Sequence, residues 1–198
     1  MIRRNSFALM LGVIIAAGGL FLRTAARASQ ESAVIPKPSS VVKPQTYVSL
    51  EPVPRGKEFQ VAVVAEIARG FHMNSNHPSD VYLIPTTLTA ELPGGFKLLD
   101  TIYPEGHAQK FSFSPDKPLD VYSGSVTIKL RVLAESGATL GPVAIPMTLR
   151  YQACNDSTCL PPVKLPVEAK IVVAETGTKT HVTHSEIFSA NSSAPASK

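Results

Sequence analysis

The sequence contains short apolar runs that alternate with polar residues and end at turn-forming residues. The run Ser125–Ala134 shows this most clearly, because every second side chain from Val126 to Val132 is apolar. A period of two places these side chains on one face of an extended chain. The polar face carries Thr127, Lys129 and Arg131. After residue 28, no stretch keeps the 3.6-residue period of a helix for three turns, so the chain is predicted to fold mainly into strands.

Similar runs recur at intervals of about ten residues. Those with the strongest β character are Thr46–Leu50, Phe59–Ala68, Thr86–Leu92, Phe96–Ile102, Val143–Ala153 and Val163–Val173. Trp is absent and aromatic residues make up 7% of the chain, so the core must consist mainly of Val, Leu and Ile, which suit a pleated surface. Seven or eight short strands in a chain of this size predict an all-β fold, an immunoglobulin-like antiparallel β-sandwich.

The N-terminus has the three parts of a secretory signal peptide. Arg3 and Arg4 precede the apolar run Phe7–Leu22, and the small-x-small site Ala26-Arg27-Ala28 follows it. We expect cleavage after Ala28, which leaves an exported chain that does not span the membrane. The alternative is an uncleaved membrane anchor, although the apolar run is shorter than the roughly 20 residues that cross a bilayer.

Composition predicts three further segments. Residues 29–45 are rich in Ser and Pro and are expected to form an extended linker. Residues 46–174 hold the apolar runs and form the predicted domain. Residues 175–198 are polar and are expected to be disordered.

The charge of the exported chain argues against nucleic acid as a partner. The whole chain has 19 Lys and Arg against 15 Asp and Glu, but residues 1–28 contain four Arg and no acid. Cleavage therefore leaves 15 residues of each sign. A neutral chain lacks the basic surface that binding to phosphate backbones requires.

The two cysteines, Cys154 and Cys159, flank a polar loop between two predicted strands. Residues 155–158 are Asn, Asp, Ser and Thr, which favour turns, so we expect a hairpin-like loop whose ends a disulfide can join. The pair could be a structural bridge, but closing so short a loop stabilises a fold by only about 2 kcal/mol. A short exposed loop also allows another thiol to approach the disulfide, as thiol–disulfide exchange requires.

Metal binding is a third interpretation of the two cysteines, although two Cys without a neighbouring His supply too few ligands. Asp156 is interpreted as a turn-capping residue or a functional acid.

The string YQACNDSTCLPP, residues 151–162, resembles the cysteine motif of the N-terminal periplasmic domain of the thiol:disulfide interchange protein DsbD. Residues 70–76 and 83–86 resemble further segments of stand-alone relatives. The resemblance implies an immunoglobulin-like fold and a periplasmic electron relay without cofactor or metal. It also implies that Cys159 forms mixed disulfides with partners and that Cys154 resolves them.

The same resemblance implies partners and a cap. The partners would be thioredoxin-like periplasmic proteins, including those of cytochrome c maturation, and a separate membrane protein as electron donor. An aromatic residue on a short loop shields the disulfide in this family, and Phe111 or Phe113 is the nearest match. The family's acidic Asp-Glu pair beside that aromatic is replaced here by Gln109-Lys110.

Two function hypotheses follow. The first is a thiol–disulfide exchange module of the protein-disulfide reductase type that uses Cys154 and Cys159. The second is a non-catalytic β-sandwich adaptor whose structural disulfide pins a hairpin while edge strands bind a partner protein. His72, Met73 and His77 also suggest a copper site, but without a further clustered ligand a loop histidine is the preferred interpretation.

Overall fold

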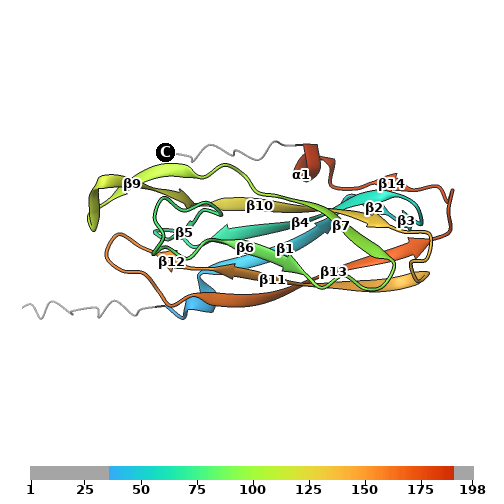
Figure 1. Ribbon diagram of the computed structural model, residues 1–198, viewed down its shortest axis with the longest axis horizontal. Coiled ribbons are helices and arrows are strands. Elements are labelled where there is room, and N and C mark those ends of the chain that lie inside the picture. The colour runs from blue at the N-terminus through green and yellow to red at the C-terminus, as the bar shows by residue number, and fades with distance from the viewer. Residues whose placement is uncertain (1–35, 190–198) are drawn as a thin grey trace, which may run out of the picture. The chain divides into compact units, whose positions relative to one another are not determined.

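Two four-stranded β-sheets pack face to face in the computed structural model, which describes residues 36–189 (Figure 1). The first sheet has the order β1-β4-β10-β7 and consists of β1 (Val42–Val48), β4 (Glu58–Ile67), β10 (Ser125–Ala134) and β7 (Phe96–Ile102). The second has the order β3-β13-β11-β6 and consists of β3 (Val53–Pro54), β13 (Val163–Ala174), β11 (Gly141–Tyr151) and β6 (Thr87–Ala90). All pairings in these sheets are antiparallel except the short parallel one between β13 and β3. The predicted all-β, immunoglobulin-like sandwich is confirmed.

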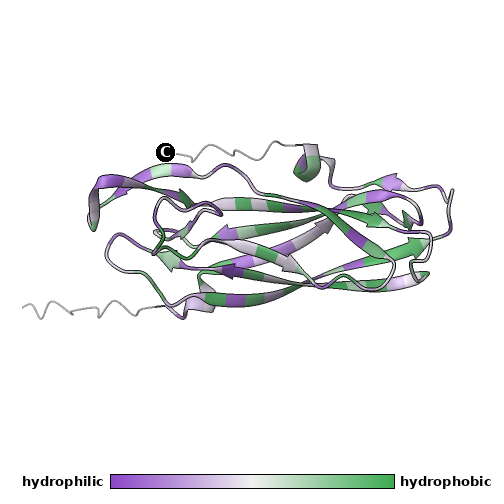
Figure 2. Ribbon diagram, in the orientation of Figure 1, coloured by the Kyte–Doolittle hydropathy of each residue, from purple (hydrophilic) through white to green (hydrophobic). Residues whose placement is uncertain are grey.

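The alternation in β10 explains how the core forms. Val126, Ile128, Leu130 and Val132 are each at most 4% exposed. They pack with apolar side chains of the opposite sheet such as Ile145 and Leu149 in one continuous core. Figure 2 shows the corresponding alternation of hydrophobic and hydrophilic residues along the strands. Burying one face of each sheet against the other is the dominant source of stability in such a fold.

A third, smaller sheet forms at one end of the sandwich, with the order β12-β5-β9-β8 (Figure 1). Its strands are β12 (Ala153–Cys154), β5 (His72–Asn74), β9 (Ser114–Tyr122) and β8 (His107–Phe111). β8 and β9 form a hairpin whose tip lies between Phe111 and Ser114, which pair with each other. We call residues 107–122 the cap hairpin. This sheet joins segments that are far apart in the sequence and places Cys154, at the end of β12, beside β5.

Regular structure extends beyond both predicted boundaries of the domain. The 3₁₀ turn η1 (Pro38–Ser40) and β1 lie largely within the predicted linker 29–45. Val41 and Val42 are each 2% exposed, and the Tyr151 hydroxyl donates a hydrogen bond to the Pro38 carbonyl (3.0 Å). Pro44 does not prevent strand formation, because β1 is an edge strand with one unpaired side. Regular structure therefore begins before residue 46.

The predicted disordered tail also contains ordered residues. β14 (His181–Val182) pairs with β2 (Leu50–Glu51), and the short helix α1 (Ser185–Ser189) follows. The hydroxyl of Thr180 donates to the Pro52 carbonyl and that of Thr183 to the Val48 carbonyl (2.6 and 2.5 Å). A polar segment can thus be held at a strand edge by hydrogen bonds. A prediction of disorder from low apolar content does not detect such attachment.

The predicted signal peptide, residues 1–28, lies outside the described residues, as does the end of the tail from residue 190. Among residues 36–189, no helix is long and apolar enough to cross a membrane.

Gly95 closes the turn before β7 and offers a test of the packing. Its φ is +83°, and an added Cβ would lie 2.5 Å from the Ala138 Cα. We expect Gly95→Ala to lower the free energy of unfolding by about 2–4 kcal/mol, since it adds backbone strain to a steric overlap. Gly94→Ala is the matched control, because no atom lies within 4 Å of its added Cβ. Urea denaturation measures both, and equal stability of the two variants would contradict the assignment.

Candidate functional site

A tight loop connects the two cysteines at the end of the sandwich where the small sheet lies. Cys154 ends β12, and Cys159 forms an isolated antiparallel bridge with it. Their side chains form a disulfide, and their Cα atoms are 3.9 Å apart. The Asn155 side-chain oxygen accepts hydrogen bonds from the backbone N–H groups of Ser157 and Thr158 (2.9 Å each), so an Asx turn shapes the loop. The hairpin-like geometry predicted from the turn-forming residues is confirmed, with Asn155 rather than Asp156 as the turn-capping residue.

The two sulfur-bearing residues differ in their access to solvent. Cys154, in β12 of the small sheet, is 1% exposed, whereas Cys159 is exposed. Leu160, which follows, is buried and donates its N–H to the Ala153 carbonyl (2.8 Å), which anchors the end of the loop. A nucleophile from solvent can therefore approach the Cys159 sulfur, whereas the protein covers Cys154.

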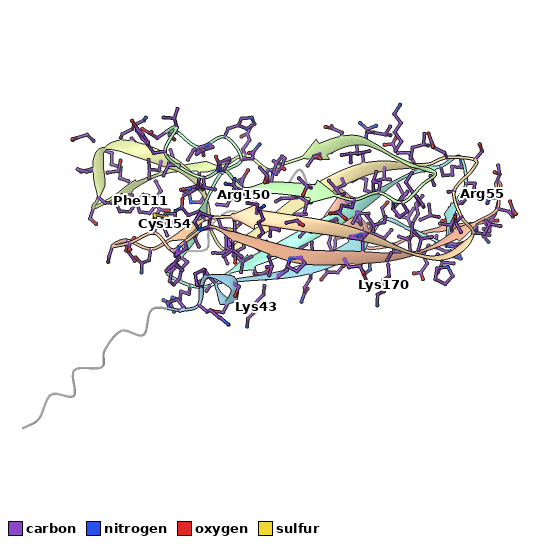
Figure 3. All side chains as sticks on the ribbon, turned by 60° about the horizontal axis from the view of Figure 1, so that its bottom comes forward. Lys43, Arg55, Phe111, Arg150, Cys154 and Lys170 are labelled. Carbon is purple, nitrogen blue, oxygen red and sulfur yellow. A yellow bond between two sulfur atoms is a disulfide. The ribbon has the colours of Figure 1, made fainter. Side chains whose placement is uncertain are left out.

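The tip of the cap hairpin reaches the cysteine loop. The Ser112 hydroxyl donates a hydrogen bond to the Asp156 carbonyl (2.7 Å), which ties the tip to the loop. Phe111 is 4% exposed and packs with Leu119 and Val121 in a small cluster of its own. Phe113 is 46% exposed and stacks on the outer side of Phe111, with ring centroids 5.3 Å apart. Figure 3 labels Phe111 and Cys154 at the same end of the molecule.

His72 lies between the cap and the disulfide. In the pairing of β5 with β12, His72 is directly opposite Cys154, so the two side chains extend from the same face of the sheet. Its ring stacks on Phe111 with centroids 4.1 Å apart and an interplanar angle of 24°. The residue is 4% exposed, and within the part of the chain that the structure describes its Nε2 has no hydrogen-bond partner. His72 is therefore not the loop histidine that its sequence neighbourhood predicts, because its pairing with Cys154 is a long-range contact.

Comparison with known families settles which family the fold and this site represent. The family model described as thiol:disulfide interchange protein DsbD, N-terminal, matches residues 39–170, which include every residue of the site described above. The chain belongs to the DsbD N-terminal domain family. The resemblance inferred from the cysteine motif is confirmed.

Solved structures of DsbD N-terminal domains are similar to this chain. The reduced domain of Neisseria meningitidis is 19% identical, with 75% of this chain and 94% of that one covered and a TM-score of 0.42. The complex of the Neisseria meningitidis DsbD N-terminal and PilB N-terminal domains gives 17% identity, coverages of 69% and 87%, and a TM-score of 0.43. The N-terminal periplasmic domain of Proteus mirabilis ScsB is 10% identical, with 65% of this chain and 46% of that one covered and a TM-score of 0.43. No curated protein matches the sequence.

The residues once considered as copper ligands do not come together in this DsbD N-terminal domain. Met73 is fully buried in the core, and His77 is exposed, with its Nδ1 2.8 Å from the Asn76 side-chain nitrogen. Within residues 36–189, no three His, Cys, Asp or Glu side chains are close enough to hold a metal ion. His72 alone of this group lies next to the disulfide.

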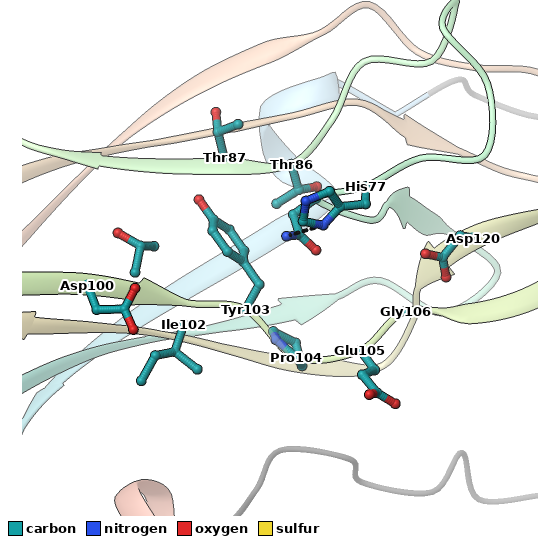
Figure 4. Close-up of a pocket in the computed structure, with 12 residues that line it drawn as sticks. His77, Thr86, Thr87, Asp100, Ile102, Tyr103, Pro104, Glu105, Gly106 and Asp120 are labelled. Atoms are coloured by element: carbon teal, nitrogen blue, oxygen red, sulfur yellow. Dashed lines mark hydrogen bonds between the residues drawn. The ribbon is translucent and has the colours of Figure 1, made fainter.

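An open hollow of about 840 Å³ lies at the base of the cap hairpin (Figure 4). Its lining includes His77, Thr86, Asp100, Tyr103, Glu105 and Asp120. The Tyr122 hydroxyl nearby is hydrogen-bonded to Asn76 and to the Pro104 carbonyl, and burial raises its pKa to about 12. No residue of the cysteine loop or of the hairpin tip lines this hollow, so it is separate from the disulfide.

The burial of His72 has a measurable pH dependence. Burial lowers its pKa from 6.5 to about 4, while Asp156 raises it and His107 lowers it by smaller amounts. The imidazole is therefore neutral in the folded protein at neutral pH.

We expect the free energy of unfolding to fall by about 3 kcal/mol between pH 7 and pH 4 through His72 alone. The unfolded chain binds a proton below pH 6.5, but the folded protein does so only near pH 4, so acid favours unfolding across that interval. His72→Phe removes this contribution and should lose less stability on acidification. Urea denaturation of both proteins at the two pH values is the measurement, and equal losses would refute the assignment.

Proposed function

We propose that this protein is a periplasmic thiol–disulfide exchange module that relays electrons between thioredoxin-like proteins through the Cys154–Cys159 pair. One observation carries the proposal most strongly. In a member of the DsbD N-terminal domain family, the disulfide joins an exposed cysteine to a buried one across a tight loop. This arrangement gives the two sulfurs different tasks, because only one of them is open to a partner protein.

The reaction needs thiolate chemistry alone. A partner thiolate attacks the Cys159 Sγ, an intermolecular S–S bond forms, and the Cys154–Cys159 bond breaks with Cys154 leaving as a thiolate. The second thiol of the partner then attacks the partner's own sulfur in the mixed disulfide and releases Cys159. The partner dithiol is oxidised, this protein gains two electrons and two protons, and the reverse sequence reduces the disulfide of the next partner.

Several details of the relay belong to the proposal. Cys159 is the sulfur that forms mixed disulfides and Cys154 the one that resolves them. Phe111 of the cap hairpin shields the pair. Residues 1–28 direct export, and a separate membrane protein supplies the electrons.

Equilibration in redox buffers tests the proposal. The protein is incubated with graded ratios of reduced and oxidised glutathione, or with reduced thioredoxin, and free thiols are counted by alkylation and mass measurement. We expect the pair to exchange with thioredoxin and to show a midpoint potential above about −300 mV. A lower midpoint without exchange would instead indicate a structural bridge and favour the adaptor hypothesis. A Cys154→Ala/Cys159→Ala double variant controls for alkylation at other sites.

A further inference from the structure

His72 is a buried polar side chain that lacks a hydrogen-bond partner at Nε2 when the disulfide is formed. The residue is 4% exposed, its ring is covered on one side by Phe111, and its Nε2 has no partner among the described residues. A buried unpaired polar group of this kind costs about 1–3 kcal/mol. Its cross-strand neighbour is Cys154, and a disulfide sulfur carries no proton that it could donate.

Reduction of the disulfide changes this environment. Cys154 then carries an S–H group, which is a hydrogen-bond donor, on the same face of the sheet as the imidazole. Cys154 is 1% exposed, so bulk water has little access to its thiol and removes the proton slowly at neutral pH. An internal acceptor would speed formation of the Cys154 thiolate, and His72 is the imidazole paired with it.

We propose that His72 accepts the proton of Cys154 when the reduced protein resolves a mixed disulfide at Cys159; this rests on the proposed function and names a further residue of the same site. The Cys154 S–H proton passes to the Nε2 of His72, and the resulting thiolate attacks the Cys159 Sγ. The Cys154–Cys159 bond forms, the bond between Cys159 and the partner sulfur breaks, and the partner leaves as a thiolate. The imidazolium then returns its proton to the leaving thiolate or to water. In the opposite direction the attacking partner thiol gives up its proton to His72, which passes it to the departing Cys154 thiolate.

The charges around the imidazole determine when it can hold a proton. Burial lowers the pKa of His72 to about 4, so the ring is neutral at neutral pH and holds a proton only while a neighbouring negative charge stabilises the imidazolium. Asp156 in the cysteine loop favours the protonated form, and His107 of β8, whose Nε2 is 3.2 Å from the Ser123 hydroxyl, opposes it. A thiolate on Cys154 would add a second negative charge next to the ring and stabilise the imidazolium only while that thiolate exists.

Two-phase kinetics with a small aromatic disulfide test the proposal without a protein partner. When the reduced protein is mixed with dithiobis(nitrobenzoate), attack by Cys159 releases one coloured thiolate, and resolution by Cys154 releases the second. We expect His72→Phe, which keeps an aromatic ring against Phe111, to slow the second phase at least about tenfold at pH 7. The first phase should be unchanged. The difference should vanish well above the ordinary thiol pKa of about 8.5, where solvent removes the proton.

His77→Phe is the matched control, because His77 is exposed and lies away from the disulfide. Its two phases should equal those of the unaltered protein. Equal slowing of both phases by His72→Phe, or a slowing of the second phase that persists at high pH, would overturn the proposal and leave His72 a structural residue.

A second measurement needs no variant, which matters if His72→Phe does not fold. In the ¹⁵N-labelled protein, the His72 Nε2 resonance is expected to shift on reduction, as it becomes a hydrogen-bond acceptor, while that of His77 stays unchanged. An unchanged His72 resonance would refute the role. Neither experiment involves a protein partner, so failure of the relay with thioredoxin-like proteins would be seen separately in the equilibration experiment.

Discussion

Cys154→Ala is expected to accumulate a covalent complex with a thioredoxin-like partner, whereas Cys159→Ala is expected to form none. The reason is the difference in exposure within the disulfide. The first variant keeps the exposed Cys159, which can attack a partner disulfide, but it lacks the thiol that would resolve the product. The second keeps only Cys154, which is 1% exposed and cannot meet a partner sulfur in line. The partner is a thioredoxin that keeps only its exposed active-site cysteine, activated as a nitrobenzoate disulfide, because it has no second thiol to release Cys159. Non-reducing electrophoresis of each reduced variant with this partner shows the complexes.

The two variants serve as controls for each other, since each has one cysteine and has lost the same short bridge. Its loss costs about 2 kcal/mol by the chain-entropy estimate, so both proteins should remain folded. Circular dichroism and urea denaturation establish this before the trapping experiment. Complexes that form equally well through either cysteine would show that exposure does not select the attacking sulfur.

Phe111→Ala should make the disulfide about tenfold more reactive toward a small dithiol such as dithiothreitol. Phe111 is the buried anchor of the cap hairpin, because it packs with Leu119 and Val121 and stacks on the His72 ring. Truncating a buried Phe costs about 2–4 kcal/mol in a small cluster of this kind. Loss of even 1.4 kcal/mol from the closed cap raises the population of the open form tenfold. The rate of thiol release under excess dithiothreitol measures the effect.

Phe113→Ala is the matched control for the cap. Phe113 occupies the same hairpin tip, but it is 46% exposed and stacks on Phe111. Its truncation should alter the reduction rate less than twofold and the free energy of unfolding by less than about 1 kcal/mol. Equal effects of the two substitutions, or no effect of Phe111→Ala on the rate, would show that the hairpin does not shield the disulfide.

Strands could be predicted from the sequence where apolar and polar residues alternate over several consecutive positions. The limits of β10 and β7 agree with the predicted runs Ser125–Ala134 and Phe96–Ile102, because alternation records which face is buried. The strands β5 and β12 were not predicted, since they contain three and two residues and have no period to detect. The start of β1 was hidden by Pro44, whose tolerance at a sheet edge depends on where the strand lies in the sheet.

In the candidate site, too, features of contiguous residues could be predicted, whereas contacts between distant segments could not. The cysteine motif, residues 151–162, is contiguous, so its turn chemistry and its family resemblance were visible in the sequence. The position of His72 opposite Cys154 depends on strand register between distant segments, and the position of Phe111 depends on the cap hairpin folding back over both. The local sequence suggested His72 only as a copper ligand or a loop histidine, and nothing in it indicated a contact with Cys154.

The sequence by itself determined the strand character of the chain, the family and the cysteine pair, because alternation, turn residues and a contiguous motif are properties of neighbouring residues. Only the tertiary structure decided that Cys159 is exposed, that Cys154 is buried and that a histidine lies beside it. These features follow from the burial of apolar surface summed over the whole sandwich. The total apolar surface buried favours one strand register over the alternatives. That register brings His72 and Cys154 together, although no pattern in the residues around either one predicts the contact.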